Sequence, residues 1–239
     1  MKTQTLLSPA NAEELYFTKK TTVVIDVLRA TTTIITALNN GAKEIIPVGS
    51  IEFAMKVSGN TFSGHTLLGG ERNTKKIEGF ALGNSPFEYS PEIVKGKSII
   101  LFTTNGSKAI VKAKYSSKLL ICSFLNVASL AKQIADSKEI VILCSGNNGL
   151  FSYEDAICAG NLIDELFKLN LDVELSDACR TSHLLFNESK NNLSEALSQT
   201  EHGTKLIENG FEPDIIYSAQ SNIVDIIPFY EKGTIQLLK

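Results

Sequence analysis

The chain has 239 residues, and its 43% hydrophobic and 21% charged residues are ordinary usage for a globular protein. Its formal net charge of −3 and pI of about 5.7 provide no basic field that would attract nucleic acid or an anionic membrane. The N-terminus lacks the apolar core of a signal peptide, and no apolar run approaches the roughly 18 residues of a membrane span. We therefore expect a cytoplasmic protein whose partner is a small molecule, with no nucleic acid and no membrane.

The cysteines are widely spaced and form no CxxC pair, which disfavours a zinc or dithiol site. The four are Cys122, Cys144, Cys158 and Cys179. Most of them stand in apolar segments, so we expect reduced thiols in the core. A nucleophilic cysteine would need an activating neighbour, and the three histidines are remote in the sequence.

Short runs rich in β-branched residues alternate with helical patterns. This alternation is typical of βαβ units and predicts an α/β fold with three α/β/α layers and a largely parallel or mixed central sheet. The expected strands are Thr21–Leu28, Glu44–Val48, Thr66–Gly69, Ser98–Thr104, Leu119–Ser123 and Glu139–Ser145. The first helices are expected at Thr32–Asn39, which Gly41 ends, and at Ile51–Val57.

Between Glu71 and Pro91 the sequence shows neither the β-branched runs of strands nor a helical pattern, so a long irregular loop is expected there. The C-terminal half returns to helices and then to the sheet. The expected elements are helices at Ser152–Leu169, Ala178–Glu188 and Leu193–Asn209, and strands at Asp214–Ser218 and Thr234–Leu238, with Pro228 as a helix breaker between the strands. Because no repeat or linker interrupts the chain, residues 1–239 are expected to form a single α/β domain or two interlocked lobes.

The first group of candidate site residues follows the first buried strand. Asp26 stands at its carboxyl end, where ligands of open α/β sheets bind, and Thr31 and Thr32 begin the next helix. A helix start offers free N–H groups to an anion, and Arg29 adds a cation with bidentate phosphate geometry. In the structural alternative, Thr31 is an N-cap and Asp26 a satisfied turn residue. Haloacid dehalogenase phosphatases need the motif Asp-x-Asp after their first strand, and here Leu28 stands in place of the second Asp. The sequence therefore excludes a phosphatase of that group.

The second group lies in the long irregular loop. Glu71 is suited to ligate a hard cation and Arg72 to bind an anion, while the glycines around them let the backbone approach a ligand. Asn84 and Ser85 add polar groups later in the same loop. The alternative is a structural Ω-loop whose charges lie on the surface.

The third group is Thr104, Asn105 and Gly106, at another junction between a strand and a helix. By itself, Asn-Gly indicates a hairpin turn. The residues that follow have a helical pattern rather than alternation, so an anion loop lined by hydroxyl groups is the preferred interpretation.

The fourth group is a flexible loop and the helix start behind it. The loop residues are Ser145, Gly146 and Asn147. Ser152 is placed to cap the helix with Asp155 at the third helical position, which explains Asp155 structurally. Glu154 and Asp155 at a helix start also suit a Mg²⁺ site.

These groups meet if their strand ends adjoin. The acids would then supply oxygen ligands for Mg²⁺, while the arginines, hydroxyls and backbone N–H groups bind an anionic substrate, as in metal-assisted phosphoryl transfer. The candidate metal ligands are Asp26, Glu71, Glu154 and Asp155, and the candidate catalytic residues are Asp26, Arg29 and Glu154. Asp26 is left open as either a nucleophile or a metal ligand beside an attacking water.

Taken in order, the strings IDVLRATTT, GGER, GFALGNSP, TTNG and CSGNNGLFSYED resemble the motifs of the 2-phosphosulfolactate phosphatase (ComB) family, over about residues 21–161. The resemblance implies Mg²⁺-dependent hydrolysis of (R)-2-phospho-3-sulfolactate to sulfolactate and phosphate, a step of coenzyme M biosynthesis. The partner would be this small, anionic, phosphorylated substrate, and Arg180 is a further candidate to bind its anionic tail.

Other functions compete with this one. A phosphatase for another phosphorylated hydroxy acid would use the same residues, and a non-catalytic anion-binding protein would use the same helix starts without chemistry. A nucleotide-dependent transferase is a further rival. A homodimer is the default expectation for a cytosolic enzyme.

Overall fold

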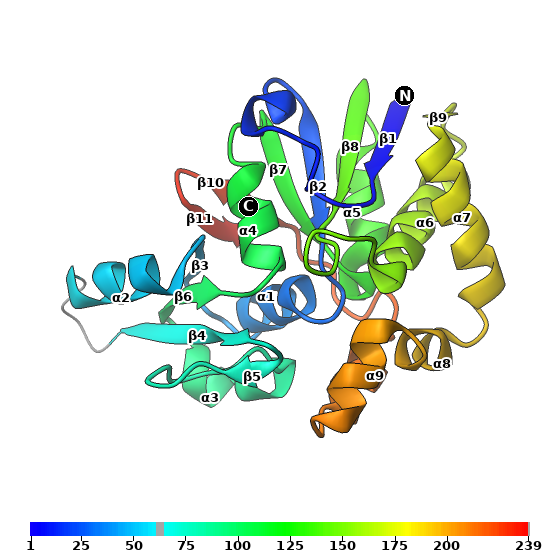
Figure 1. The fold of residues 1–239 in the computed structure, drawn as a ribbon. Helices are drawn as coiled ribbons and strands as arrows, with labels where there is room; N and C mark the ends of the chain where they lie inside the picture. The colour runs from blue at the N-terminus through cyan, green and yellow to red at the C-terminus, as the bar shows by residue number, and fades with distance from the viewer. Residues whose placement is uncertain (61–64, 239) are drawn as a thin grey trace.

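A computed structural model describes residues 1–60 and 65–238 and confirms the α/β class (Figure 1). In this part of the chain, eleven strands form one sheet in the order β5-β4-β6-β3-β11-β10-β7-β2-β8-β1-β9. The strands are β1 (Lys2–Leu6), β2 (Thr21–Ile25), β3 (Glu44–Pro47), β4 (Thr66–Arg72), β5 (Lys75–Lys76), β6 (Ser98–Phe102), β7 (Lys118–Cys122), β8 (Glu139–Cys144), β9 (Glu174–Leu175), β10 (Pro228–Glu231) and β11 (Thr234–Leu237).

The sheet consists of two blocks of parallel strands joined by an antiparallel hairpin. Strands β4, β6 and β3 are parallel in the first block, and β7, β2, β8, β1 and β9 are parallel in the second. The C-terminal hairpin β10–β11 pairs antiparallel with β7 on one side and β3 on the other, so it joins the blocks. The mixed sheet is thus confirmed, while the choice between a single domain and two interlocked lobes stays a prediction.

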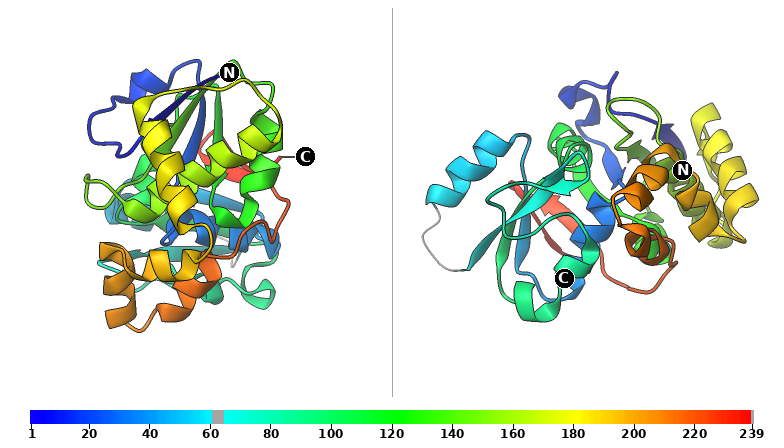
Figure 2. Two further views of the ribbon diagram at one scale, coloured as in Figure 1. Left: turned by 90° about the vertical axis from the view of Figure 1, so that its right-hand side faces the viewer. Right: turned by 60° about the horizontal axis from the view of Figure 1, so that its bottom comes forward.

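Helices cover both faces of the sheet. The helices of the second block are α5 (Val127–Ile134), α6 (Tyr153–Lys168) and α7 (Asp177–Ser189), and they pack on one face of β2, β7 and β8 (Figure 2, left). Helices α1 (Ala30–Asn39) and α4 (Gly106–Lys112) pack on the opposite face, and α2 (Ile51–Asn60) packs on β6. No helix within residues 1–60 and 65–238 is long and apolar enough to cross a membrane.

Strand β2 shows how the sequence pattern produces these layers. Its residues are β-branched, and all of Val23, Val24 and Ile25 are fully buried. Val23 and Ile25 belong to the core under α5 and α6, whereas Val24 belongs to the core under α1 and α4. The four cysteines lie in the first of these cores and are free and buried, as predicted.

The predicted strand at Asp214–Ser218 is wrong, because these residues belong to helix α10 (Glu212–Ser218). Pro213 lies in the first turn of this helix, where its missing N–H removes no hydrogen bond. Ile215 is buried and Ile216 is exposed, so only one face of the helix packs against the core. A short apolar run cannot be assigned to strand or helix by periodicity alone.

The predicted helix at Leu193–Asn209 is in fact two helices, α8 (Leu193–Ser198) and α9 (Glu201–Glu208). The Thr200 side chain caps α9 by accepting a hydrogen bond of 2.9 Å from the Gly203 N–H. Gly203 packs closely on α8, since a Cβ there would lie 2.0 Å from the Leu197 carbonyl oxygen. The sharp break at Thr200 sets the direction of α9.

Other differences concern the N-terminus, the long loop and two strands that were not predicted, β9 and β10, the second of which begins at Pro228. Strand β1 was not expected, because its buried positions are Thr3 and Thr5, which give no hydrophobic alternation. The expected irregular loop contains the end of β4, the short strand β5 and the 3-10 helix η2 (Pro86–Glu88). The remaining short helices are η1 (Glu14–Phe17), α3 (Pro91–Val94) and η3 (Phe124–Asn126).

Candidate functional site

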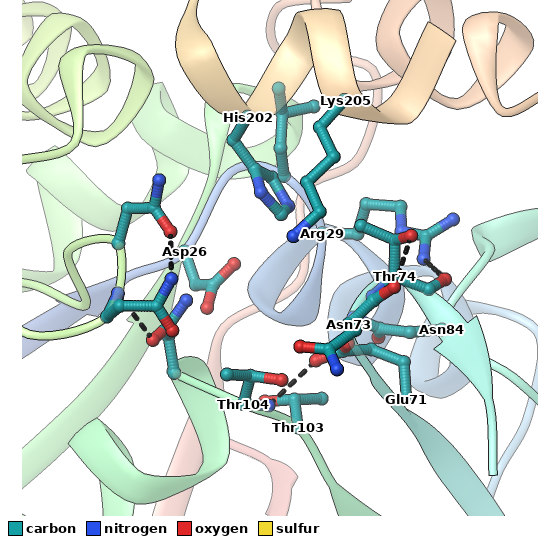
Figure 3. Close-up of a pocket in the computed structure, with 14 residues that line it drawn as sticks. Asp26, Arg29, Glu71, Asn73, Thr74, Asn84, Thr103, Thr104, His202 and Lys205 are labelled. Carbon is teal, nitrogen blue, oxygen red and sulfur yellow. Dashed lines mark hydrogen bonds between the residues drawn. The ribbon is translucent and has the colours of Figure 1, made fainter. Parts of the chain in front are cut away.

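A pocket lies where the carboxyl ends of β2, β4, β6 and β8 face helix α9 (Figure 3). It is lined by Asp26, Leu28, Arg29, Glu71, Asn73, Thr74, Asn84, Thr103, Thr104, Asn105, Asn147, Asn148, His202 and Lys205. Strands β4 and β6 belong to one block of the sheet, and β2 and β8 belong to the other. The pocket is therefore built between the two blocks, and α9 closes one side of it.

Asp26 follows the last residue of β2, and the residue is only 6% exposed. One carboxylate oxygen accepts a hydrogen bond of 3.1 Å from the Ala30 N–H at the start of α1. The other lies against Gly106, where an added Cβ would be 2.4 Å away. Burial raises the pKa of Asp26 to about 6 despite the Ala30 hydrogen bond, and the nearby Glu71 carboxylate also raises it.

Thr31 and Thr32 do not line the pocket. The Thr31 hydroxyl donates to the Asp26 carbonyl oxygen at 2.8 Å and accepts from the Asp26 N–H at 3.0 Å. The Thr32 hydroxyl donates to the Val27 carbonyl oxygen at 2.9 Å. Neither residue is the N-cap, which is Arg29, so the N-cap alternative for Thr31 is wrong. Both hydroxyls instead hold the loop that carries Asp26.

Arg29 forms a buried ion pair with Asp214, with 2.6 Å between guanidinium nitrogen and carboxylate oxygen. The two side chains are 1% and 3% exposed. A second guanidinium nitrogen donates to the Thr74 carbonyl oxygen at 2.8 Å, and the Ser85 hydroxyl donates to Asp214 at 2.7 Å. The guanidinium carbon lies 4.2 Å from the centre of the Phe211 ring. Arg29 thus fastens three separate segments together, and Asp214 offsets its charge.

Glu71 lines the pocket, but both of its carboxylate oxygens accept backbone hydrogen bonds. One bond comes from the Thr74 N–H at 2.8 Å and the other from the Thr104 N–H at 2.7 Å. The Asn84 side-chain oxygen and the Thr104 hydroxyl oxygen are buried without a hydrogen-bond partner in the described residues. Since buried polar atoms are rarely left unpaired, both atoms indicate a position for a bound ligand.

Asp155 is buried outside the pocket and is occupied by hydrogen bonds. One carboxylate oxygen accepts from the Val27 N–H at 2.9 Å, and the other accepts from the Ser145 hydroxyl at 3.0 Å and the Gly146 N–H at 3.2 Å. The predicted cap is confirmed, because the Ser152 hydroxyl accepts from the Asp155 N–H. Burial, reinforced by the nearby Asp26, raises the pKa of Asp155 well above its usual range. Ser145, Gly146 and Asp155 therefore shape the loop beside Asp26.

Glu154 is 5% exposed and also stands outside the pocket lining. Burial raises its pKa, and its side chain interacts with the hydroxyls of Ser152 and Thr200. Within residues 1–60 and 65–238, no group of three or more His, Cys, Asp or Glu side chains is arranged to hold a metal ion. The four predicted metal ligands are therefore not one cluster, and only Asp26 and Glu71 face the pocket.

The other candidates divide between the pocket and its surroundings. Asn105 and Asn147 line the pocket, as do Asn84 and Thr104, and the Asn105 side-chain oxygen accepts from the Asn148 N–H at 3.1 Å. Gly106 lies beneath Asp26 and Ser85 beside Asp214, so both support the pocket without lining it. Arg72 and Arg180 are exposed and are not brought to the pocket. Their predicted roles in substrate binding stay predictions.

Helix α9 contributes two lining residues that were not among the candidates, His202 and Lys205. Both side chains reach toward the space between Asp26 and Thr74 in Figure 3. Burial, reinforced by the positive charge of Arg29, lowers the pKa of His202 to about 4, so the imidazole is neutral at pH 7. No local motif marks these two residues, because their place depends on how α9 packs.

The fold and the pocket are those of an α/β enzyme whose candidate ligand site lies at the carboxyl edge of its sheet. The chain belongs to the 2-phosphosulpholactate phosphatase family, whose sequence model matches residues 6–233. The resemblance seen in the motifs is therefore confirmed, and it extends beyond them over nearly the whole chain.

Three relatives illustrate the match, and each is named "probable 2-phosphosulfolactate phosphatase". The protein of Clostridium novyi (strain NT) is 41% identical over 229 residues, which cover 95% of this chain and 96% of the relative. That of Caldanaerobacter subterraneus subsp. tengcongensis is 42% identical over 219 residues, covering 91% and 90%. That of Clostridium tetani is 39% identical over 237 residues, covering 99% and 100%.

The buried Arg29–Asp214 pair yields a prediction about stability. Removing one partner, as in Asp214→Leu or Arg29→Met, leaves an uncompensated buried charge and should lower the free energy of unfolding by about 3–5 kcal/mol. The double variant Arg29→Met, Asp214→Leu leaves no uncompensated charge. Its free energy of unfolding should therefore fall by much less than the sum of the decreases in the two single variants. Urea unfolding of the four proteins measures this coupling, and strictly additive losses would contradict it.

The pKa of Asp26 yields a second prediction, for the metal-free protein in EDTA. Its pKa is 3.8 when unperturbed and about 6 in the fold. The folded chain therefore holds this proton longer than the unfolded chain, and stability falls as pH rises from about 4 to 6. Asp26→Asn should be more stable than the parent at pH 7.5, by on the order of 2 kcal/mol, and the gain should vanish below pH 4.

Urea unfolding at pH 3.5 and 7.5 measures this difference. The control is Asp136→Asn, which changes an exposed carboxyl and should shift stability by no more than about 0.5 kcal/mol at either pH. Equal stabilities of the parent and Asp26→Asn at pH 7.5 would show that burial of this carboxyl carries no cost.

Proposed function

We propose that this chain hydrolyses (R)-2-phospho-3-sulfolactate to sulfolactate and inorganic phosphate. The observation that carries the proposal is the family match over residues 6–233, a range that contains every residue lining the pocket. The names of the relatives, which align over at least 90% of their length, support the same substrate. The pocket adds a buried carboxylate and unpaired polar atoms at the edge of the sheet where such a ligand binds.

Asp26 is the residue that we place beside the reacting phosphorus. In the overall reaction the bond between phosphorus and the ester oxygen breaks, a bond from phosphorus to a water oxygen forms, and the ester oxygen leaves with a proton. Water attacks directly in one route, and Asp26 would then act as a ligand of the metal ion. In the other route the Asp26 carboxylate attacks first, and water then hydrolyses the aspartyl phosphate. Mass spectrometry of the acid-quenched enzyme separates the routes, because only the second adds a phosphoryl group to the peptide that contains Asp26.

The donor groups of the pocket fit Mg²⁺, which is commonly held by one or two carboxylates, with waters and substrate oxygens as its other ligands. We propose that Asp26 and Glu71 hold it, since they are the predicted ligands that face the pocket. When bound, the ion supplies positive charge to the phosphoryl oxygens. Glu154 and Asp155 are better explained as buried supports of the Asp26 loop and of α9.

The charges of the pocket support the need for an added cation. Asp26 and Glu71 are acidic, and the charge of Arg29 is offset by Asp214, which leaves Lys205 as the unpaired cation among the lining residues. A phosphorylated sulfonic and carboxylic acid brings several more negative charges. Without a divalent ion, the positive charge of the pocket would be too small to offset the negative charge of the substrate.

The first test is a phosphate-release assay on (R)-2-phospho-3-sulfolactate. We expect turnover with Mg²⁺ that EDTA abolishes, and a loss of kcat of about a thousandfold or more in Asp26→Asn, because the carboxylate next to phosphorus is removed. Asp136→Asn serves as the control and should retain parental activity. Turnover that persists in EDTA would contradict the metal proposal.

The same assay addresses the other functions. A panel of phosphorylated hydroxy acids would reveal a different preferred substrate if phosphosulfolactate is turned over poorly. Phosphate release from none of them, with ligand binding unchanged in Asp26→Asn, would indicate a non-catalytic anion-binding protein. Product formation that requires ATP would indicate a transferase. A cytoplasmic location and a homodimer stay predictions, which cell fractionation and light scattering would test.

A further inference from the structure

The pocket has two cations, and they differ in what surrounds them. Arg29 is buried and paired with Asp214 at 2.6 Å. Lys205, on α9, makes no ion pair with any residue that the structure describes, and its ammonium group points into the cavity (Figure 3). Its charge is therefore free for a ligand, whereas the charge of Arg29 is already offset.

The depth of the lining residues places this charge at the mouth. Asp26, Asn84 and Thr103 are buried at the base of the pocket, with exposed fractions of 6%, 4% and 1%. Lys205 and Asn148 are exposed, so they lie at the entrance. A phosphoryl group that reacts beside Asp26 occupies the base, and the rest of the substrate then extends toward Lys205.

No neighbouring group of the described residues supplies a second unpaired positive charge at the entrance of the pocket. His202, one turn away on the same helix, is neutral at pH 7, because burial lowers its pKa to about 4. The exposed Arg72 and Arg180 are not among the residues that line the pocket. Helix α9 is itself held in place by the Thr200 cap and by the close contact of Gly203 with α8. Lys205 is therefore a flexible side chain on a fixed helix.

We propose that Lys205 binds the acidic group of the substrate that is not transferred, and that it makes the pocket select phosphorylated acids over phosphate esters of neutral alcohols. This inference rests on the proposed phosphatase function. A lysine suits the role, because its compact ammonium on a flexible stem can meet a carboxylate or a sulfonate without a fixed bidentate geometry. The residue determines specificity and takes no part in the bond changes at phosphorus.

The kinetic test compares two substrates in Lys205→Met and Lys205→Arg. For (R)-2-phospho-3-sulfolactate, we expect kcat/KM of Lys205→Met to fall about tenfold to a hundredfold, mostly through KM, because one charged hydrogen bond is lost. For isopropyl phosphate, which has no second acidic group, kcat/KM should change less than about twofold. Lys205→Arg retains the charge and should recover most of the preference.

A binding measurement makes the test independent of turnover. Calorimetry with Mg²⁺ present should show that Lys205→Met weakens the binding of sulfolactate and leaves that of inorganic phosphate unchanged. The matched control is Lys132→Met, which removes an exposed lysine of α5 away from the pocket and should bind both ligands as the parent does. This control separates a local contact from a general loss of positive charge.

Two outcomes would overturn the proposal. In the first, Lys205→Met lowers kcat/KM equally for both substrates, or weakens the binding of sulfolactate and of phosphate equally, which would mean that Lys205 contacts the phosphoryl group. In the second, Lys205→Met binds sulfolactate as the parent does, which would mean that Lys205 does not contact the acidic group. If the parent hydrolyses no phosphate ester, the proposed function fails by itself, and the calorimetry still decides the role of Lys205 in binding an acidic ligand.

Discussion

The ion pair between Arg29 and Asp214 holds together the parts of the chain that build the pocket. Arg29 belongs to the loop after β2, Asp214 to α10, and the hydrogen bonds to Thr74 and from Ser85 bring in the long loop between β4 and α3. A buried pair gains little stability on balance, because both charges lose their hydration. Its effect is positional, since any shift of one segment would leave a buried charge unpaired. The ion pair thereby helps to fix the position of one block of the sheet relative to the other across the pocket.

The same pairing decides the charge that the pocket offers to a ligand. Arg29 would be the obvious phosphate-binding residue, yet Asp214 offsets its charge. Burial keeps the pKa of Asp26 near 6, so its carboxylate is ionised at neutral pH with little solvent around it. These properties are the basis for the proposals that a cation binds at the base of the pocket and that Lys205 at the entrance binds the anionic tail of the substrate. Binding the two ends of the substrate by separate charges is a simple way to position its phosphorus.

Much of this site could be predicted from the sequence. The motifs at the carboxyl ends of strands contain Asp26, Glu71, Asn84, Thr104 and Asn147, and the structure brings all five to one pocket. The prediction failed to separate residues that line the pocket from those that support them. A hydroxyl or a carboxylate in such a motif can bind the backbone equally well, as Thr31 and Asp155 do. Which atoms remain unpaired depends on the folded geometry around each group.

By itself, the sequence determined the fold class, the family, the free thiols and the Ser152 cap, because periodicity, capping and motif order are local properties of the chain. The tertiary structure decided which acids face the pocket, how the C-terminal hairpin joins the two blocks, and that α9 supplies His202 and Lys205. Lys205 and Asp26 line the same pocket although many elements separate them in the sequence, and the packing of α9 after the break at Thr200 places Lys205 there. Contacts of that kind follow from the shape of the core, which no local pattern encodes.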